Sequence, residues 1–237
     1  MKKVISFIAS NYRNDKIWLR RTLPSKRDYK ILIAIDDSLS MKESNLGFFS
    51  LEASVALGEA LNRLEVGKVA VARIRDRLEL VQSFEDNYSA ERAAHIVSAF
   101  NFKHCGQTSA DTAMANFVSD SNKLLDMQNT SSAGSSCPFV IVLSDGRFNK
   151  ENVRRYMREA KEKKYLYIFV CLDKKGSKDQ SIMQMKSANK QPNGGIKLDS
   201  YMKDFPFEYY CVVSDTSQLP QSLGTILVQW FSMVSNQ

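Results

Sequence analysis

The feature that most constrains the fold is a continuous apolar run that ends in acidic residues. Residues 30–36 read Lys-Ile-Leu-Ile-Ala-Ile-Asp, and residues 139–145 repeat this form as Phe-Val-Ile-Val-Leu-Ser-Asp. A strand without polar alternation is typical of the middle of a parallel sheet, where both faces are covered. Residues 165–172 and 207–213 have the same character. We therefore expect four buried strands in one central sheet.

Amphipathic stretches separate these strands. Apolar residues recur at helical spacing over residues 51–64, 113–125, 153–164 and 219–234. Residues 68–84 instead predict two adjacent strands joined by Arg75-Asp76-Arg77, which form an antiparallel edge. The segment 173–195 is rich in Lys, Ser, Asn and Gly and is expected to be irregular surface. The fold class is α/β: a doubly wound, mostly parallel sheet with an antiparallel edge strand and helices on both faces.

The charge is distributed unevenly along the chain. Residues 1–30 contain nine Lys or Arg and two Asp or Glu, whereas residues 31–145 contain nine basic and fifteen acidic residues. Residues 146–203 are basic again, with fifteen Lys or Arg and six Asp or Glu. We expect residues 1–29 to form a basic arm that packs on one domain of residues 30–237. The basic segments would suit RNA or a nuclear import receptor, although a solvated surface explains them equally well.

Several classes of protein do not fit this sequence. No apolar run approaches the roughly 18 residues of a membrane span, and we expect neither a secretory signal nor a membrane partner. The four cysteines show no C-x-x-C spacing, which favours a reducing, intracellular compartment. The pair Gly67-Lys68 has Asn62 where a Walker A motif needs glycine, so no ATP site is expected in this chain.

Polar residues collect where the predicted central strands end. Asp36, Ser38 and Ser40 follow the first strand, Thr108 lies in the loop before a helix, and Asp145 follows the 139–144 strand. Ligands of open α/β sheets bind beyond the carboxyl ends of the strands. Oxygen donors without a His or Cys set suit a hard ion, so we expect Mg²⁺, with Mn²⁺ or Ca²⁺ as possible substitutes. Three hydroxyls with few direct carboxylates leave such an ion electron-poor, so an Asp or Glu from a partner would complete its shell.

This pattern resembles the metal-ion-dependent adhesion site of von Willebrand factor A domains. The motif D-x-S-x-S matches Asp36, Ser38 and Ser40, and the loop Thr and Asp match Thr108 and Asp145. The resemblance implies that Ser38, Ser40 and, with ligand bound, Thr108 touch the metal, while Asp36 and Asp145 act largely through water. Asp37 has no counterpart in the motif. The alternative to a metal site is that the acids belong to ordinary loops and that the serines cap the helix near Ser50.

Four segments narrow the resemblance to the midasin family, giant AAA-type ATPases of large ribosomal subunit (60S) assembly. These segments are residues 15–28, 34–41, 64–67 and 201–207. The resemblance implies a non-enzymatic, protein-binding domain that captures the ubiquitin-like domain of pre-ribosome assembly factors through a carboxylate on the metal. It also implies an ATPase ring elsewhere in the full-length protein, which removes those factors, and a location in the nucleus, including the nucleolus.

A phosphotransfer domain is the enzymatic alternative, because receiver domains and haloacid-dehalogenase phosphatases also place acids after the first strand and bind Mg²⁺. The phosphatase needs an acid two residues after Asp36, where this chain has Ser38. A receiver would use Asp36, Asp37 and Asp145, with Lys174 as a further candidate, but would leave the two serines and Thr108 without a role. Nucleic-acid binding as the main role draws only on the basic segments, without an RNA-binding motif.

Overall fold

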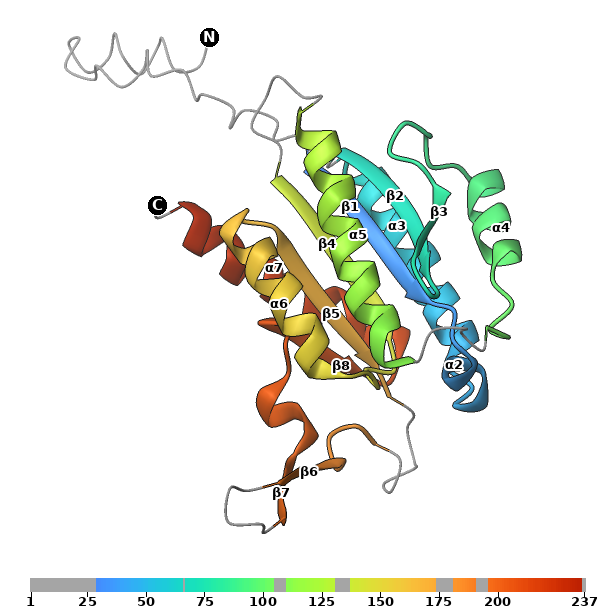
Figure 1. The fold of residues 1–237 in the computed structure, drawn as a ribbon. Coiled ribbons are helices and arrows are strands. Elements are labelled where there is room, and N and C mark those ends of the chain that lie inside the picture. The colour runs from blue at the N-terminus through green and yellow to red at the C-terminus, as the bar shows by residue number, and fades with distance from the viewer. Residues whose placement is uncertain are drawn as a thin grey trace, which may run out of the picture.

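One six-stranded sheet organises the molecule (Figure 1). The computed structural model describes residues 29–65, 67–104, 110–130, 137–173, 181–190 and 196–235. Its strands, in the order in which they lie, are β3 (Leu78–Gln82), β2 (Gly67–Ile74), β1 (Tyr29–Asp36), β4 (Cys137–Ser144), β5 (Leu166–Leu172) and β8 (Tyr209–Val213). All neighbours are parallel except β2 and β3. The expected parallel sheet with an antiparallel edge strand is confirmed.

Helices cover both faces of this sheet. The helices are α2 (Leu39–Glu43), α3 (Gly47–Arg63), α4 (Ala90–Ala99), α5 (Ala110–Thr130), α6 (Lys150–Glu162) and α7 (Leu219–Ser235). In Figure 1, α5 and α6 lie in front of the sheet, α3 and α7 lie behind it, and α4 flanks the β3 edge. None of the described helices is long and apolar enough to cross a membrane. Residues 1–28 of the expected basic arm lie outside the described residues.

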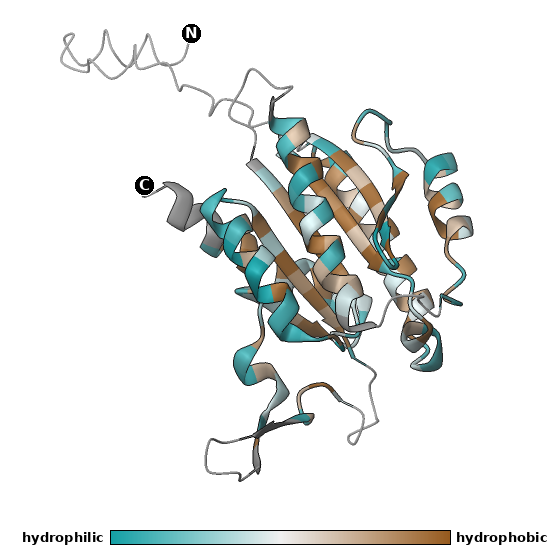
Figure 2. Ribbon diagram, in the orientation of Figure 1, coloured by the Kyte–Doolittle hydropathy of each residue, from teal (hydrophilic) through white to brown (hydrophobic). Residues whose placement is uncertain are grey.

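Alternate residues of β1 divide the core between the two faces. Ile31, Ile33 and Ile35 are fully buried and pack with residues of α3 and α7. Leu32 and Ala34 are also fully buried and pack with residues of α5 and α6. Figure 2 shows this as apolar strands between helices whose outer sides are polar. Each fully buried aliphatic side chain contributes on the order of 2 kcal/mol, so the strand that leads to the site is among the most firmly held.

The short helix α2, helix α4 and the strands β6 and β7 were absent from the sequence-based prediction. Helix α4 lies in a stretch for which no helix was expected, and only Ile96 of it is buried. The segment 173–195 was expected to be irregular, and this is wrong in part, because β6 (Lys186–Lys190) pairs antiparallel with β7 (Ile196–Ser200). These two strands form a separate two-stranded sheet, and two 3-10 helices, η3 (Tyr201–Asp204) and η4 (Thr216–Gln218), follow it in the chain. Strand β6, Lys-Ser-Ala-Asn-Lys, has no apolar alternation, and β7, Ile-Lys-Leu-Asp-Ser, alternates over only five residues, which is a weak signal for a strand.

Candidate metal centre

The loops after β1 and β4 converge because these strands are neighbours. Their register runs in parallel as far as Ile35 opposite Leu143, so Asp36 and Ser144 end the two strands side by side. The Ser144 hydroxyl donates to Asp36 Oδ2 over 2.6 Å. From β1 the chain turns to β2 on one side, whereas β4 lies on the other, and such a reversal of strand order is where open α/β sheets bind ligands.

The two serines of the D-x-S-x-S motif lie next to Asp36. The Ser38 N–H donates to Asp36 Oδ1 over 3.0 Å, and the hydroxyls of Ser38 and Ser40 are 2.9 Å apart. Ser38 occupies the N-cap position of α2, but its side chain makes no capping hydrogen bond. The helix near Ser50 begins at Gly47 and has Leu46 as its N-cap, so neither serine caps it. The helix-cap alternative is therefore wrong.

Asp145 has a buried oxygen to which none of the described residues donates. The residue is 4% exposed, and its Oδ1 accepts the Arg147 N–H over 3.1 Å. No hydrogen-bond donor among the described residues reaches its Oδ2, which is also buried. Burial raises the pKa of Asp145 above its ordinary value, although the Arg147 N–H and the Ser40 hydroxyl lower it. A buried carboxylate oxygen without a donor is costly, and a cation is the natural partner for it.

The pKa of Asp36, like that of Asp145, is raised by burial. Burial, followed by the charge of Asp145, raises the pKa of Asp36 from 3.8 to about 6, while hydrogen bonds from Ser144 and Ser38 oppose the rise. Two carboxylates that repel each other in a buried place are stabilised in their charged forms by a cation between them. The described residues contain no group of three or more His, Cys, Asp or Glu that could hold a metal. The candidate donors are the carboxylates of Asp36 and Asp145 with the hydroxyls of Ser38 and Ser40, and oxygen donors of this kind fit a hard divalent ion.

Asp37 lies beside Asp36 but has a different role. Its side chain is fully buried, and its Oδ2 accepts a charge-assisted bond from Arg75 over 2.8 Å. Its Oδ1 accepts the backbone N–H groups of Asn101, over 3.3 Å, and Phe102, over 2.8 Å. Asp37 therefore anchors the β2–β3 turn and the loop after α4. Because these donors occupy both of its oxygens, it is not available as the metal acid that the receiver alternative requires.

The loop that Asp37 holds is strained at Phe102. This residue has a φ of 51°, in the left-handed region, which costs an aromatic residue about 1 to 2 kcal/mol. The strain persists because the surroundings fix the loop: its ring stacks on Phe100 at 6.0 Å and covers Gly47 of α3. A Cβ on Gly47 would lie 2.8 Å from that ring, so only glycine fits there.

The same loop also contacts the turn after β1 that carries Ser38 and Ser40. His104 forms a parallel bridge with Ser38, and its carbonyl accepts the Leu39 N–H over 3.2 Å. Thr108, the fifth predicted site residue, follows four residues later and lies outside the described residues. The structure thus brings together Asp36, Ser38, Ser40 and Asp145.

Sequence reasoning missed two residues that shape this site, Ser144 and Tyr201. The Tyr201 hydroxyl lies 2.9 Å from the carbonyl oxygens of both Gly146 and Phe148 and accepts the Phe148 N–H over 3.2 Å. It thereby holds the turn that follows Asp145. Tyr201 begins the segment 201–207, which the sequence comparison with the midasin family had singled out without giving it a role.

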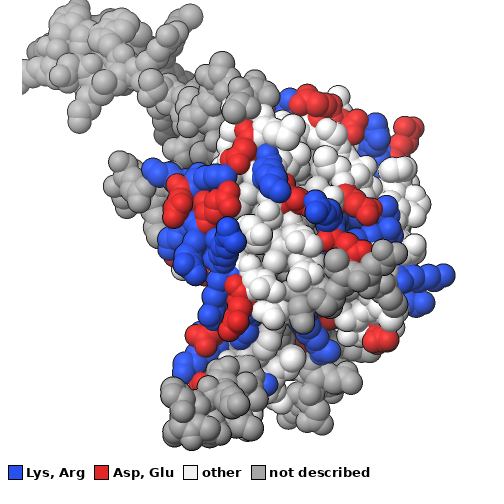
Figure 3. All heavy atoms as spheres, in the orientation of Figure 1, with Lys and Arg blue, Asp and Glu red and all other residues white. Residues whose placement is uncertain are grey.

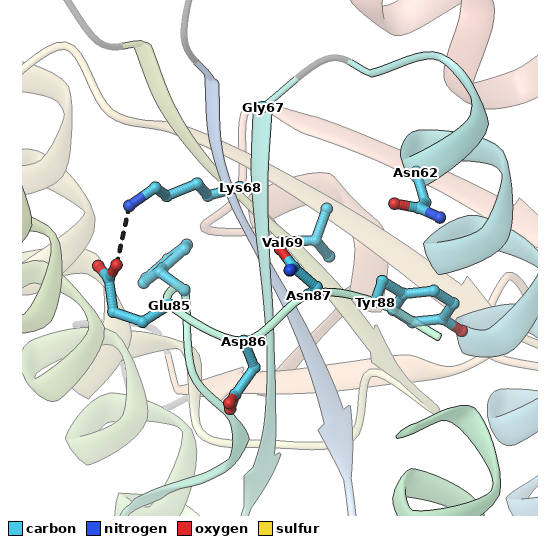
Figure 4. Close-up of a pocket in the computed structure, with 9 residues that line it drawn as sticks. Asn62, Gly67, Lys68, Val69, Glu85, Asp86, Asn87 and Tyr88 are labelled. Carbon is cyan, nitrogen blue, oxygen red and sulfur yellow. Dashed lines mark hydrogen bonds and ion pairs between the residues drawn. The ribbon is translucent and has the colours of Figure 1, made fainter. Parts of the chain in front are cut away.

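A small pocket lies at the opposite end of the sheet. It encloses about 130 Å³ beside Gly67 and Lys68 at the start of β2, with Tyr88 and Asp86 on its other side (Figure 4). The ion pair between Lys68 and Glu85, 3.0 Å long, crosses its edge. Because β1 and β2 are parallel, this pocket and the Asp36 turn lie at opposite ends of the strands, so it takes no part in the candidate metal centre.

Solved structures share this fold at low sequence identity. The manganese-loaded TRAP protein of Plasmodium vivax matches 84% of this chain and 72% of its own, with a TM-score of 0.55 and 14% identity. A mussel byssus thread matrix protein with a zinc-occupied MIDAS motif matches 84% of this chain and 47% of its own, with a TM-score of 0.53 and 14% identity. The protein BatB of Bacteroides thetaiotaomicron matches 88% of this chain and all of its own, with a TM-score of 0.51 and 14% identity. These likenesses show the fold alone.

Sequence relatives match the chain over its full length. No protein-family model matches it. Midasin of Dictyostelium discoideum is 38% identical over 100% of this chain, and midasin of Giardia intestinalis is 31% identical over 99% of it. The chain spans only 4% and 5% of the lengths of these two relatives. Matches along the whole chain, together with the sheet and the acids at its ends, identify it as a midasin domain with the von Willebrand factor A fold.

Proposed function

We propose that this domain binds Mg²⁺ at the carboxyl ends of β1 and β4 and uses it to capture a protein that offers an Asp or Glu. Asp36, Ser38, Ser40 and Asp145 would hold the ion, together with Thr108 from outside the described residues. Bound there, the ion supplies an electron-poor centre for a partner's carboxylate. The observation that carries the proposal is the buried Asp145 Oδ2, which no donor in the described part of the chain reaches, next to a second carboxylate of raised pKa.

The related structures support a divalent ion at this place. One neighbour is described as manganese-loaded and another as having zinc in a MIDAS motif, and both share the fold of this chain. The oxygen-only donors favour Mg²⁺, with Mn²⁺ or Ca²⁺ as substitutes. The chain itself acts by binding, without a catalytic step.

The midasin relationship supports a proposal for the partner. We propose that it is the ubiquitin-like domain of a pre-60S assembly factor, and that the ATPase ring of the full-length protein then pulls this factor away. The ring belongs to the rest of the protein, because this chain spans only 4 to 5% of its relatives. The corresponding location is the nucleus, including the nucleolus.

A secondary contact with pre-ribosomal RNA or an import receptor remains a proposal based on charge alone. Figure 3 shows Lys and Arg gathered with Asp and Glu over the face that carries α6. There, Lys161 pairs with Glu208 over 2.9 Å, and Lys163 pairs with Asp126 and Glu159 over 2.7 Å each. These acids neutralise much of the cluster, so residues 161–164 support nucleic-acid binding weakly.

Binding of the ubiquitin-like domain in Mg²⁺ or EDTA tests the proposed function. We expect capture by the wild-type chain in Mg²⁺, and loss of capture in EDTA and in the variants Asp36→Ala and Thr108→Ala. Glu43→Ala is the matched control, because Glu43 is an exposed acid on α2 near the site. Capture that continues unchanged in EDTA and in both variants would show that the metal mechanism is wrong.

A further inference from the structure

The largest exposed apolar side chain near the candidate metal centre is Phe48. Its exposed fraction is 88%, the highest among the exposed large apolar residues in the described parts of the chain. Phe48 lies in the first turn of α3, next to Phe49, which packs partly against the core. In Figure 1, α2 and the start of α3 lie at the end towards which β1 and β4 point. An exposed aromatic ring at a binding end is a typical anchor for a protein partner.

The surroundings fix the position of Phe48. Gly47, the preceding residue, lies against the Phe102 ring and cannot accept a Cβ. The Ser50 hydroxyl donates to the Gly47 carbonyl over 2.7 Å, and the Leu46 N–H donates to Met41 of α2 over 2.8 Å. The ring of Phe48 is therefore presented from a backbone that is tied to the metal-binding turn. A pre-organised anchor loses little conformational entropy when a partner binds.

A second exposed apolar residue, Met183, stands on the other side of the site. It is 56% exposed and follows the buried Ile182, whose Cδ1 lies 2.5 Å from where a Cβ on Gly146 would be. Gly146 directly follows Asp145, so the contact of Ile182 with Gly146 holds Met183 on the β4 side of the site. Phe48 is held in the same way on the β1 side, through α2. The turn is fixed to the end of β5, because the Ser181 hydroxyl donates to Asp173 over 2.6 Å. Methionine adapts its shape to different apolar surfaces.

Exposed charges at this end are mainly positive. The turns of residues 37–48, 75–77, 101–104 and 145–149 expose four cations and one acid: Lys42, Arg77, Lys103, Arg147 and Glu43. This sign is opposite to that of the whole segment 31–145, whose acids outnumber its bases by fifteen to nine. A cationic rim complements an acidic protein surface and speeds its approach.

We infer that Phe48 and Met183 form an apolar clamp around the metal, and that the partner presents its carboxylate from within an apolar patch of an otherwise acidic surface. This inference rests on the proposed function and adds the chemistry of the surface that surrounds the donated carboxylate. The clamp excludes water from the contact between the metal and the carboxylate, which strengthens that contact. Phe48 and Met183 thus determine specificity without binding the metal.

Titration of the ubiquitin-like domain onto the 237-residue chain and its variants tests the clamp. We expect Phe48→Ser to weaken binding in Mg²⁺ about tenfold or more, and Met183→Ser about threefold to tenfold. Leu64→Ser and Met127→Ser are the matched controls, because both side chains are similarly exposed, at 70% and 69%, but lie at the far ends of α3 and α5. The controls should remain within twofold of the wild-type chain. The affinity for Mn²⁺ alone should be the same in all four variants, because none of these residues binds the metal.

The outcomes separate the clamp from the proposed function. If the double variant Phe48→Ser/Met183→Ser binds like the wild-type chain while Asp36→Ala does not, the clamp is wrong and the proposed function stands. If Asp36→Ala binds like the wild-type chain and binding persists in EDTA, both are wrong. If light scattering shows that the wild-type chain dimerises and that Phe48→Ser abolishes the dimer, a second copy covers this surface, and the clamp is again wrong.

Discussion

Two buried carboxylates at the same end of the sheet have opposite surroundings. Asp37 is fully buried and accepts one charged and two backbone donors. Asp145 is 4% exposed, and none of the residues that the structure describes donates to one of its oxygens. The β2 side of the site is thus electrostatically complete and stabilises the fold. On the β4 side, a cation would supply the missing partner of Asp145. Burial alone therefore does not distinguish a structural acid from a binding acid; the inventory of donors does.

Removal of Asp37 should have the largest effect on stability. Asp37→Ala leaves the largely buried Arg75 guanidinium and two backbone N–H groups without their acceptor, and such a loss costs about 3 to 5 kcal/mol. We expect the melting temperature of the metal-free chain to fall by roughly 10 °C. Glu43→Ala, which removes an exposed acid of α2, is the control. An unchanged melting temperature of Asp37→Ala would remove the contrast between the two acids.

Acidity should affect the metal-free chain through Asp36. Its pKa is raised from 3.8 to about 6 in the folded state, so between these pH values the folded state binds more protons than the unfolded state. The free energy of unfolding should therefore decrease, on the order of 2 kcal/mol, as the pH rises from 4 to 7 in EDTA. Denaturant titrations at several pH values measure this, and Asp36→Asn should flatten the slope. A wild-type slope equal to that of Asp36→Asn would contradict the raised pKa.

Neutralisation of Asp145 should have the smallest effect. Asp145→Asn removes a buried charge that lacks a full set of donors, so in EDTA its stability should equal that of the wild-type chain or exceed it by up to about 1 kcal/mol. Saturating Mg²⁺ should stabilise the wild-type chain but leave this variant unchanged. Thermal unfolding with and without Mg²⁺ provides the comparison. Marked destabilisation of Asp145→Asn in EDTA would place Asp145 with Asp37 as a structural acid.

The sequence predicted the central sheet because buried parallel strands leave a continuous apolar run. The sequence also predicted that Asp36 and Asp145 lie close together, because the carboxyl ends of neighbouring parallel strands lie at the same edge of the sheet. The role of Asp37 was not predictable, because its partners Arg75 and Phe102 lie 38 and 65 residues away. Helix α4 was not predicted because most of its apolar residues are alanines: only Ile96 is buried, and Ala93 and Ala99 pack partly against the core.

The exposure of Phe48 was equally hidden in the sequence. Phe48 and Phe49 are identical in type, and only the packing of α3 decides that one is exposed and the other partly buried. The contacts of Tyr201 also depend on tertiary structure, because its hydroxyl reaches residues 53 and 55 positions earlier. Local patterns therefore predicted the candidate metal donors, of which the structure brings Asp36, Ser38, Ser40 and Asp145 together, whereas the residues that position them required the fold.

The Tyr201 hydroxyl has a consequence for the timescale on which the site opens. The hydroxyl of Tyr201 holds the turn after Asp145. The backbone N–H of Tyr201 donates to the Met185 carbonyl over 2.8 Å, at the start of the β6–β7 ribbon. The amides of Phe148 and Tyr201 should therefore exchange with deuterium at a common rate, as one cooperatively opening unit. Rupture of this unit would free the Asp145 turn and the ribbon in a single event, while the remaining sheet stays closed.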